Sequence, residues 1–113
     1  MIFKELIERL SGKSTEEKIL FTKLLLSGMT IMNRAIGDDN MISDKSKVET
    51  LKWSNELAHR IWNVLFELER GNDDESASRV AENIKFYQQQ SGELAAHLNT
   101  TIKATIDKFN HLK

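Results

Sequence analysis

The chain contains no cysteine among its 113 residues. This absence excludes disulfide bonds, thiolate nucleophiles and zinc sites built on cysteine. A chain without disulfides is compatible with a reducing compartment, so we expect a cytoplasmic location.

Proline is also absent, and glycine occurs at only five positions. Because proline interrupts helices, its absence leaves long helices unbroken. Charge of one sign is not in excess, since 16 Lys and Arg stand against 17 Asp and Glu. A surface that binds nucleic acid is usually basic, so this balance argues against nucleic acid as a partner.

The sequence has no long uninterrupted hydrophobic run. The most apolar stretch covers residues 19–32 and contains Lys23, which makes it too short and too charged to be predicted as a membrane span. Near the N-terminus, Lys4 and Glu5 come too early for the apolar region of a signal peptide. We therefore expect a soluble protein with no membrane partner.

Apolar residues recur at helical spacing in most of the chain. A short helix is predicted at about residues 2–10. A second helix should begin at the capping box formed by Ser14 and Glu17 and run to about Ile36. The residues that form the apolar face of the first helix are Ile2, Phe3, Leu6, Ile7 and Leu10.

Gly28 and Ala35 lie seven residues apart within the apolar arc of the second predicted helix. Small residues at these positions would let a neighbouring helix approach closely. The alternative is that they are gaps tolerated in the apolar arc, and the sequence leaves both interpretations open.

A third helix is predicted from a cap at Ser43 or Ser46 to about Arg70. A fourth should be capped by Asp73 or Asp74, because acidic side chains favour a helix N-terminus. Its apolar stripe keeps its phase through Gly92 to Leu112, which predicts one continuous helix, straight or bent at Ser91–Gly92. The alternative is a loop at residues 88–92 between two shorter helices.

No segment alternates convincingly between apolar and polar residues, so no sheet is expected. Short connections favour antiparallel neighbours. The predicted fold is all-α with a single domain over residues 1–113. We expect an antiparallel helical bundle of one short N-terminal helix and three long helices in an up-down-up order, the last being the longest.

This arrangement would leave the end of the last helix uncovered. A helix of about 37 residues outruns one of about 26 by about 15 Å, yet its apolar stripe continues over Ile102, Ile106 and Phe109. Either the short first helix or a second copy of the chain could cover these residues. We therefore predict them as a partner interface, possible in a homodimer, with Trp53 at the margin of the third helix as a further candidate.

His59 is the main candidate for chemistry. Glu56 and His59 have the Glu-x-x-His spacing of di-iron helical bundles, but the motif occurs once, and no matching buried glutamate is found. The Ala58-His59 pair also resembles the reactive histidine segment of histidine phosphotransfer domains, which are small helical bundles. The lysine and glycine that follow in that family are missing here, and Trp62 lies near their place.

Other reactive patterns are weaker. Glu93 and His97 are four residues apart and could form a two-ligand clip for a metal. Both lie opposite the apolar stripe, so an exposed pair with only local electrostatic interaction is expected. The sequence contains neither a Gly-x-Ser-x-Gly elbow nor a glycine-rich phosphate loop.

These observations predict a non-enzymatic helical module for protein–protein interaction, such as an adaptor, small chaperone, regulator or inhibitor. It would act through an apolar helix face toward a protein partner or a second copy of itself. No cofactor, metal or small-molecule substrate is expected. The alternative is a histidine phosphotransfer-like signalling domain or a metal-binding bundle centred on His59.

Overall fold

A computed structural model describes residues 2–112, and it describes no side chain at residues 2–4 or 7. The predicted core positions Ile2, Phe3 and Ile7 therefore lie outside the described side chains. Within residues 2–112 the secondary structure is entirely helical, which confirms the all-α class. The five helices are α1 (Ile2–Ser11), α2 (Thr15–Asp38), α3 (Asp44–Glu69), α4 (Ser76–Gln88) and α5 (Gly92–Leu112).

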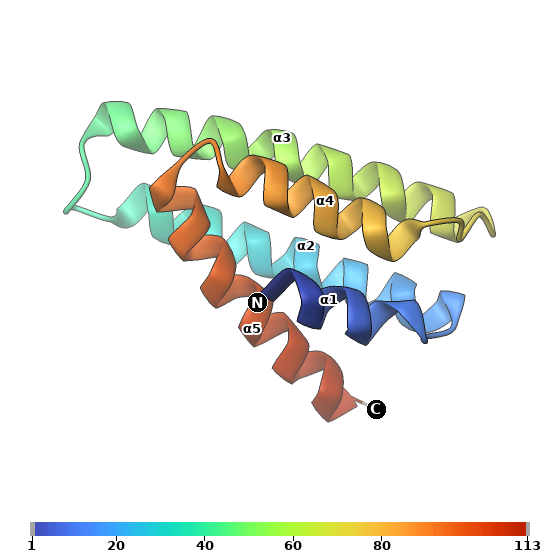
Figure 1. Ribbon diagram of the computed structural model, residues 1–113. Coiled ribbons are helices and arrows are strands. Elements are labelled where there is room, and N and C mark those ends of the chain that lie inside the picture. Colours follow the sequence, from blue (N-terminus) through green and yellow to red (C-terminus); the bar gives the residue numbers. More distant parts are fainter. Residues whose placement is uncertain (1, 113) are drawn as a thin grey trace.

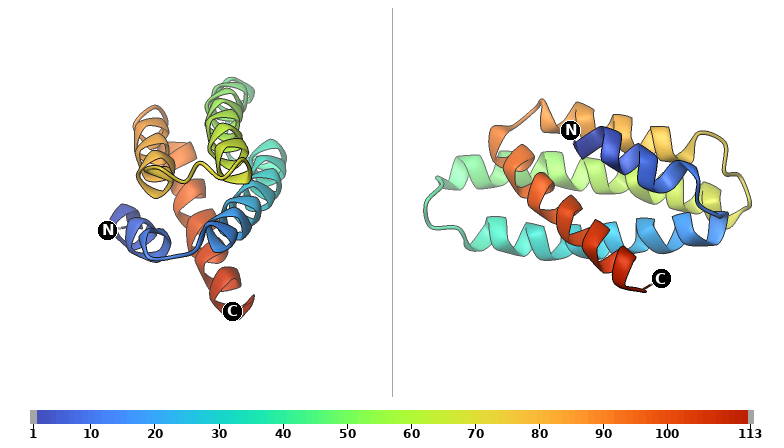
Figure 2. Two further views of the ribbon diagram at one scale, coloured as in Figure 1. Left: turned by 90° about the vertical axis from the view of Figure 1, so that its right-hand side faces the viewer. Right: turned by 60° about the horizontal axis from the view of Figure 1, so that its bottom comes forward.

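The helices pack around one interior (Figure 1). α3 runs antiparallel to α2, and α4 runs antiparallel to α3, as the short connections predict. Seen end-on, α1, α4, α3 and α2 form an open ring, and α5 crosses its open side obliquely (Figure 2). α5 packs mainly against α2, and α1 lies chiefly against α4.

The helix starts predicted for α2 and α3 are confirmed. Ser14 caps α2, and both hydrogen bonds of its capping box with Glu17 are present. Ser43, rather than Ser46, caps α3, because its hydroxyl accepts a hydrogen bond from the Ser46 backbone N–H at 3.1 Å. Both caps depend only on residues three apart in the chain, so the sequence alone could reveal them.

The prediction of one long last helix is wrong, and the alternative of a loop at residues 88–92 between two shorter helices is confirmed. The chain leaves helical structure after Gln88, reverses direction and begins α5 at Gly92, so α3 with 26 residues is the longest helix. The break is about as long as one helical turn, which is why the apolar stripe keeps its phase across it. The missed signal is Ser91, whose hydroxyl accepts from the Leu94 backbone N–H at 3.2 Å and caps α5.

The predicted caps at Asp73 and Asp74 are also wrong. α4 begins at Ser76, after Glu75 in a left-handed conformation that supplies no side-chain cap. Asp73 instead binds side chains: it accepts from Thr15 at 2.8 Å, Lys18 at 2.9 Å and Ser76 at 2.6 Å. This carboxylate therefore ties the first turn of α2 to the start of α4.

The electrostatics of Asp73 follow from these contacts. Burial by itself would raise the pKa of the carboxyl. Hydrogen bonds from Ser76, Lys18 and Thr15, together with the charge of Lys18, lower the pKa by a larger amount. The net result is a pKa below the ordinary value of an aspartate. The ionised form is therefore the one that stabilises the fold.

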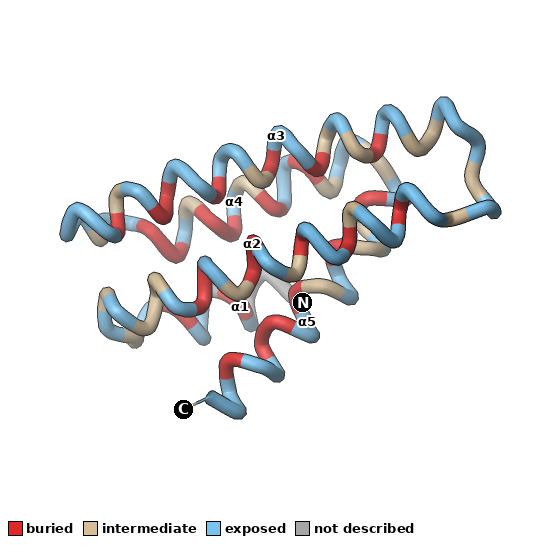
Figure 3. The backbone as a smooth tube through the Cα atoms, turned by 180° about the vertical axis from the view of Figure 1, so that it is seen from behind, coloured by how far each residue is buried: buried red, intermediate tan, exposed pale blue. Residues whose placement is uncertain are grey.

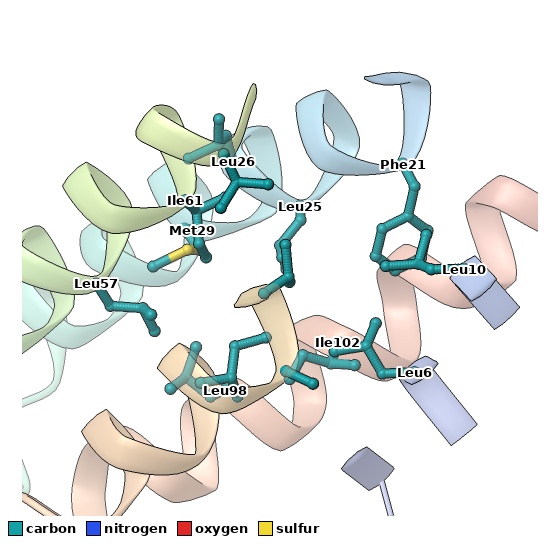
Figure 4. Close-up of a cluster of buried hydrophobic side chains, with 14 of the residues drawn as sticks. Leu6, Leu10, Phe21, Leu25, Leu26, Met29, Leu57, Ile61, Leu98 and Ile102 are labelled. Atoms are coloured by element: carbon teal, nitrogen blue, oxygen red, sulfur yellow. The ribbon is translucent and has the colours of Figure 1, made fainter. Parts of the chain in front are cut away.

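The buried side chains form one contiguous core along the inner faces of all five helices (Figure 3). Leu6 and Leu10 of α1 enter it beside Phe21 of α2 and Ile102 of α5 (Figure 4). Phe21 also packs edge-to-face on Phe109, with ring centroids 5.4 Å apart. Short α1 therefore contributes to the same core that the longer helices build.

Gly28 marks the close approach of α2 to α5. A Cβ added there would lie 3.0 Å from the Thr101 methyl and 3.3 Å from the Thr105 hydroxyl. This contact confirms that a small residue allows a neighbouring helix to approach at this position. Ala35, the second small residue, is exposed.

Two glycine substitutions in α2 test this contact. Gly37→Ala is expected to raise the free energy of unfolding by about 0.5 kcal/mol, because a Cβ there meets nothing within 4 Å and alanine favours helix. Gly28→Ala should gain nothing or lose stability, since Thr101 must move to admit the methyl group. Chemical denaturation of both variants measures the difference, and equal gains would contradict the close approach.

α2 is also the most apolar helix by length and composition. An 18-residue window within it has a mean hydropathy of 1.3, which a membrane span could also have, and 39% of that window is buried inside the bundle. The core helix of a soluble protein and a signal sequence share these properties. The cytoplasmic location therefore stays a prediction.

Candidate functional site

The three residues predicted as a partner interface lie in the core of the chain itself. Ile102 and Phe109 are completely buried, and Ile106 is 4% exposed. α2 supplies most of the cover, since α5 crosses it directly. The reason for expecting an external partner at these residues was an overhanging helix, and the structure contains no such overhang. A homodimer through the C-terminal helix stays a prediction, but an overhanging helix no longer supports it.

Trp53 is half-buried on α3, as its place at the margin of the apolar arc indicates. Its ring packs on Tyr87 of α4 with centroids 6.2 Å apart, and the Lys52 ammonium lies 5.1 Å from its ring centroid. Both contacts of the Trp53 ring are therefore made with residues of the bundle itself. Trp53 is therefore chiefly a contact between α3 and α4.

His59 is exposed in the middle of α3, and Glu56 beside it is exposed as well. The two border a shallow polar depression with Asn55, Arg60 and Asn63. No second carboxylate among the described residues approaches His59 closely enough to form a three-ligand cluster with it. The geometry gives no support to a di-iron site at this position.

An apolar groove lies between α2 and α5 on the described surface. It has a volume of about 450 Å³. Ile31 borders the groove with 63% of its surface exposed. We call it the α2/α5 groove, and its lining residues are Leu24, Gly28, Ile31, Met32, Ala35, His97, Thr100, Thr101, Ala104, Thr105 and Lys108.

The α2/α5 groove continues toward the C-terminus. Leu24, Ala104 and Lys108 also line a second apolar depression that ends at Leu112, which is 62% exposed. From His97 to Leu112 the edge formed by α5 is about 22 Å long at about 1.5 Å per residue. Together the two depressions form an elongated apolar trough rather than a compact cavity.

Sequence reasoning could not find this groove from helix wheels alone. Ile31, Met32 and Ala35 all fall on the apolar arc of α2 at helical spacing. Only Met32 of these is buried, because α5 crosses α2 obliquely and diverges from it toward its ends. The crossing leaves part of the apolar arc open to solvent.

Other exposed apolar side chains lie away from this groove. Trp62 and Phe66 of α3 contact each other with ring centroids 6.2 Å apart, and both are about half exposed. Phe86 of α4 packs edge-to-face on Tyr87 and is also about half exposed. None of these three residues borders the α2/α5 groove.

A second feature appears where α2 ends and α5 begins. The fold brings Asp39, the C-cap of α2, to Glu93 and His97 in the first turns of α5. One ligand atom from each side chain lies within 4.8 Å of the other two. The sequence predicted the Glu93–His97 pair but could not supply Asp39, which is more than fifty residues away in the chain.

No protein-family model matches the chain, and no curated protein and no solved structure is significantly similar to it. The α2/α5 groove and the Asp39–Glu93–His97 cluster are the two features of the described surface that suggest a function.

Proposed function

We propose that this chain is a non-enzymatic helical module for protein–protein interaction, which binds an amphipathic helix of a protein partner in the α2/α5 groove. One observation carries the proposal. The five helices already share a complete core, yet an apolar trough with Ile31 at its edge stays open to solvent. Contiguous exposed apolar surface is typical of interaction sites.

The shape of the trough favours a helix as the ligand. An amphipathic helix inserts side chains at positions i, i+4 and i+7 along one face, which spans about 10 Å of groove. The α2/α5 groove and its continuation are long enough for these anchors. A compact small molecule would leave much of the trough uncovered.

The lining of the groove suits such a ligand. Gly28, Ala35 and Ala104 are small and leave room for the anchoring side chains. Thr100 and Lys108 add polar groups that can donate hydrogen bonds to the partner. Apolar contacts with a polar border are the usual composition of protein interfaces.

The experiment compares affinity capture from the native host by the wild-type chain, Ile31→Asp and Phe86→Asp. Both substitutions place a carboxylate at an exposed apolar position, but only Ile31 borders the groove. We expect a protein captured by the wild type and by Phe86→Asp to be lost with Ile31→Asp, with at least about a tenfold drop in affinity for a hot-spot contact.

A photo-crosslinking residue at Ala104 then identifies the segment of the captured protein in the groove. The proposal requires that segment to be an amphipathic helix. Equal capture by Ile31→Asp and the wild type, or crosslinks to a second copy of this chain, would contradict it. Sedimentation of the purified chain measures self-association directly.

A further inference from the structure

Asp39, Glu93 and His97 have the chemistry and the placement of metal ligands. Glu93 and His97 lie one turn apart on the same face of α5, as paired ligands on a helix do. Asp39 approaches them from the end of α2. Two carboxylates and one imidazole from two separate helices thus converge on one point.

The distances fit a metal ion between the three side chains. A point equidistant from three atoms 4.8 Å apart lies about 2.8 Å from each, and zinc bonds to nitrogen and oxygen are about 2.0–2.2 Å long. Each ligand atom therefore has to move by less than about 1 Å toward the ion to reach bonding distance. Glu93 is exposed and can make this adjustment by changing its rotamer.

Hydrogen bonds or ion pairs among the three side chains do not account for their close approach. Within residues 2–112, no hydrogen bond or ion pair joins any two of the three side chains, and no lysine or arginine pairs with Asp39 or Glu93. Asp38 and Asp39 also stand at the C-terminus of α2, whose last turn contains no basic residue. The negative end of the α2 dipole is offset in part by the positive end of the α5 dipole beside Glu93, so the two carboxylates supply the charge that attracts a cation.

The carboxylate of Asp39 is also held in position. One of its oxygens accepts a hydrogen bond from the Met41 backbone N–H at 2.8 Å, and its own backbone N–H donates to Ile36. The second oxygen stays available as a ligand. A hydrogen bond of this kind to a ligating carboxylate orients it and increases metal affinity.

We propose that Asp39, Glu93 and His97 bind a divalent transition-metal ion, with Zn²⁺ as the best fit. Imidazole favours such ions over Mg²⁺ and Ca²⁺, and three protein ligands leave at least one position for water. This inference does not rest on the proposed function, because the three ligands meet without any groove ligand, although His97 borders both the cluster and the groove. It also departs from the expectation that the chain needs no metal.

The test is zinc titration of the chain purified without a polyhistidine tag, followed by NMR of its three histidine rings. We expect one Zn²⁺ per chain and a shift of the His97 ring resonances alone, since His59 and His111 lie elsewhere. Binding should also raise the melting temperature, because the ion joins two helices that are distant in sequence.

Variants separate this site from adventitious binding. Asp39→Asn keeps the acceptor for the Met41 N–H but weakens metal ligation, and His97→Gln removes the imidazole. Each should lower zinc affinity by at least about tenfold, while His59→Gln should leave it unchanged. Absence of zinc uptake by the wild type, equal affinity in Asp39→Asn, or a shift of His59 or His111 in place of His97 would each overturn the proposal.

Discussion

Ile106→Asp is expected to unfold a large fraction of the chain at room temperature. Ile106 is 4% exposed in the core between α5 and α2, so the substitution removes buried apolar surface and buries a charge in its place. The loss of the isoleucine alone costs about 2–5 kcal/mol. The unpaired carboxylate adds to that cost, and small domains have only about 5–15 kcal/mol of total stability.

The measurement is the free energy of unfolding from urea denaturation, followed by circular dichroism. Ile31→Asp is the matched control, because it makes the same chemical change on the exposed border of the groove. We expect its stability to stay within about 0.5 kcal/mol of the wild type, as for other surface substitutions. A folded Ile106→Asp chain with unchanged stability would show that this part of α5 is not core.

The second large effect is expected for Asp73→Ala, which should lower the free energy of unfolding by about 2–3 kcal/mol. The carboxylate accepts hydrogen bonds from Thr15, Lys18 and Ser76, and its loss leaves the largely buried Lys18 ammonium without its partner. Asp74→Ala is the control, because this neighbouring aspartate is exposed. A change of similar size in both variants would mean that the cluster around Asp73 has no special role.

The stabilisation by Asp73 should depend on pH in a defined direction. Because folding lowers its pKa, the contribution is complete above the unfolded value of about 3.9 and is lost as the pH falls through the folded value. The difference in stability between the wild type and Asp73→Ala should therefore be constant near neutral pH and shrink in acid below about pH 4. A difference that grows on acidification would contradict the lowered pKa.

Short-range rules accounted for much of the secondary structure. The capping box at Ser14, the serine cap of α3 and the apolar periods placed α2 and α3 within about two residues of their observed bounds. The same rules misplaced the last third of the chain. The three residues after Gln88 are nearly one helical turn, so the helical period could not reveal the reversal before α5.

That one error changed the functional interpretation. With a continuous last helix, Ile102, Ile106 and Phe109 would have overhung the bundle, and either the first helix or a second copy of the chain had to cover them. With the reversal, α5 folds back on α2, and the same residues complete the core of the chain. The exposed apolar surface then lies at Ile31 and along the α2/α5 groove instead.

The sequence by itself determined the all-α class, the cap at Ser14 and the apolar faces, and it narrowed the cap of α3 to Ser43 or Ser46, because these depend on residues within a few positions of one another. Only the tertiary structure decided which part of each apolar face stays open and which distant side chains meet. The crossing of α5 over α2 creates the groove, and the same crossing brings Asp39 to Glu93 and His97. A helix period specifies the direction of a side chain around its own axis, but the angle and position at which two helices cross depend on the packing of the whole core.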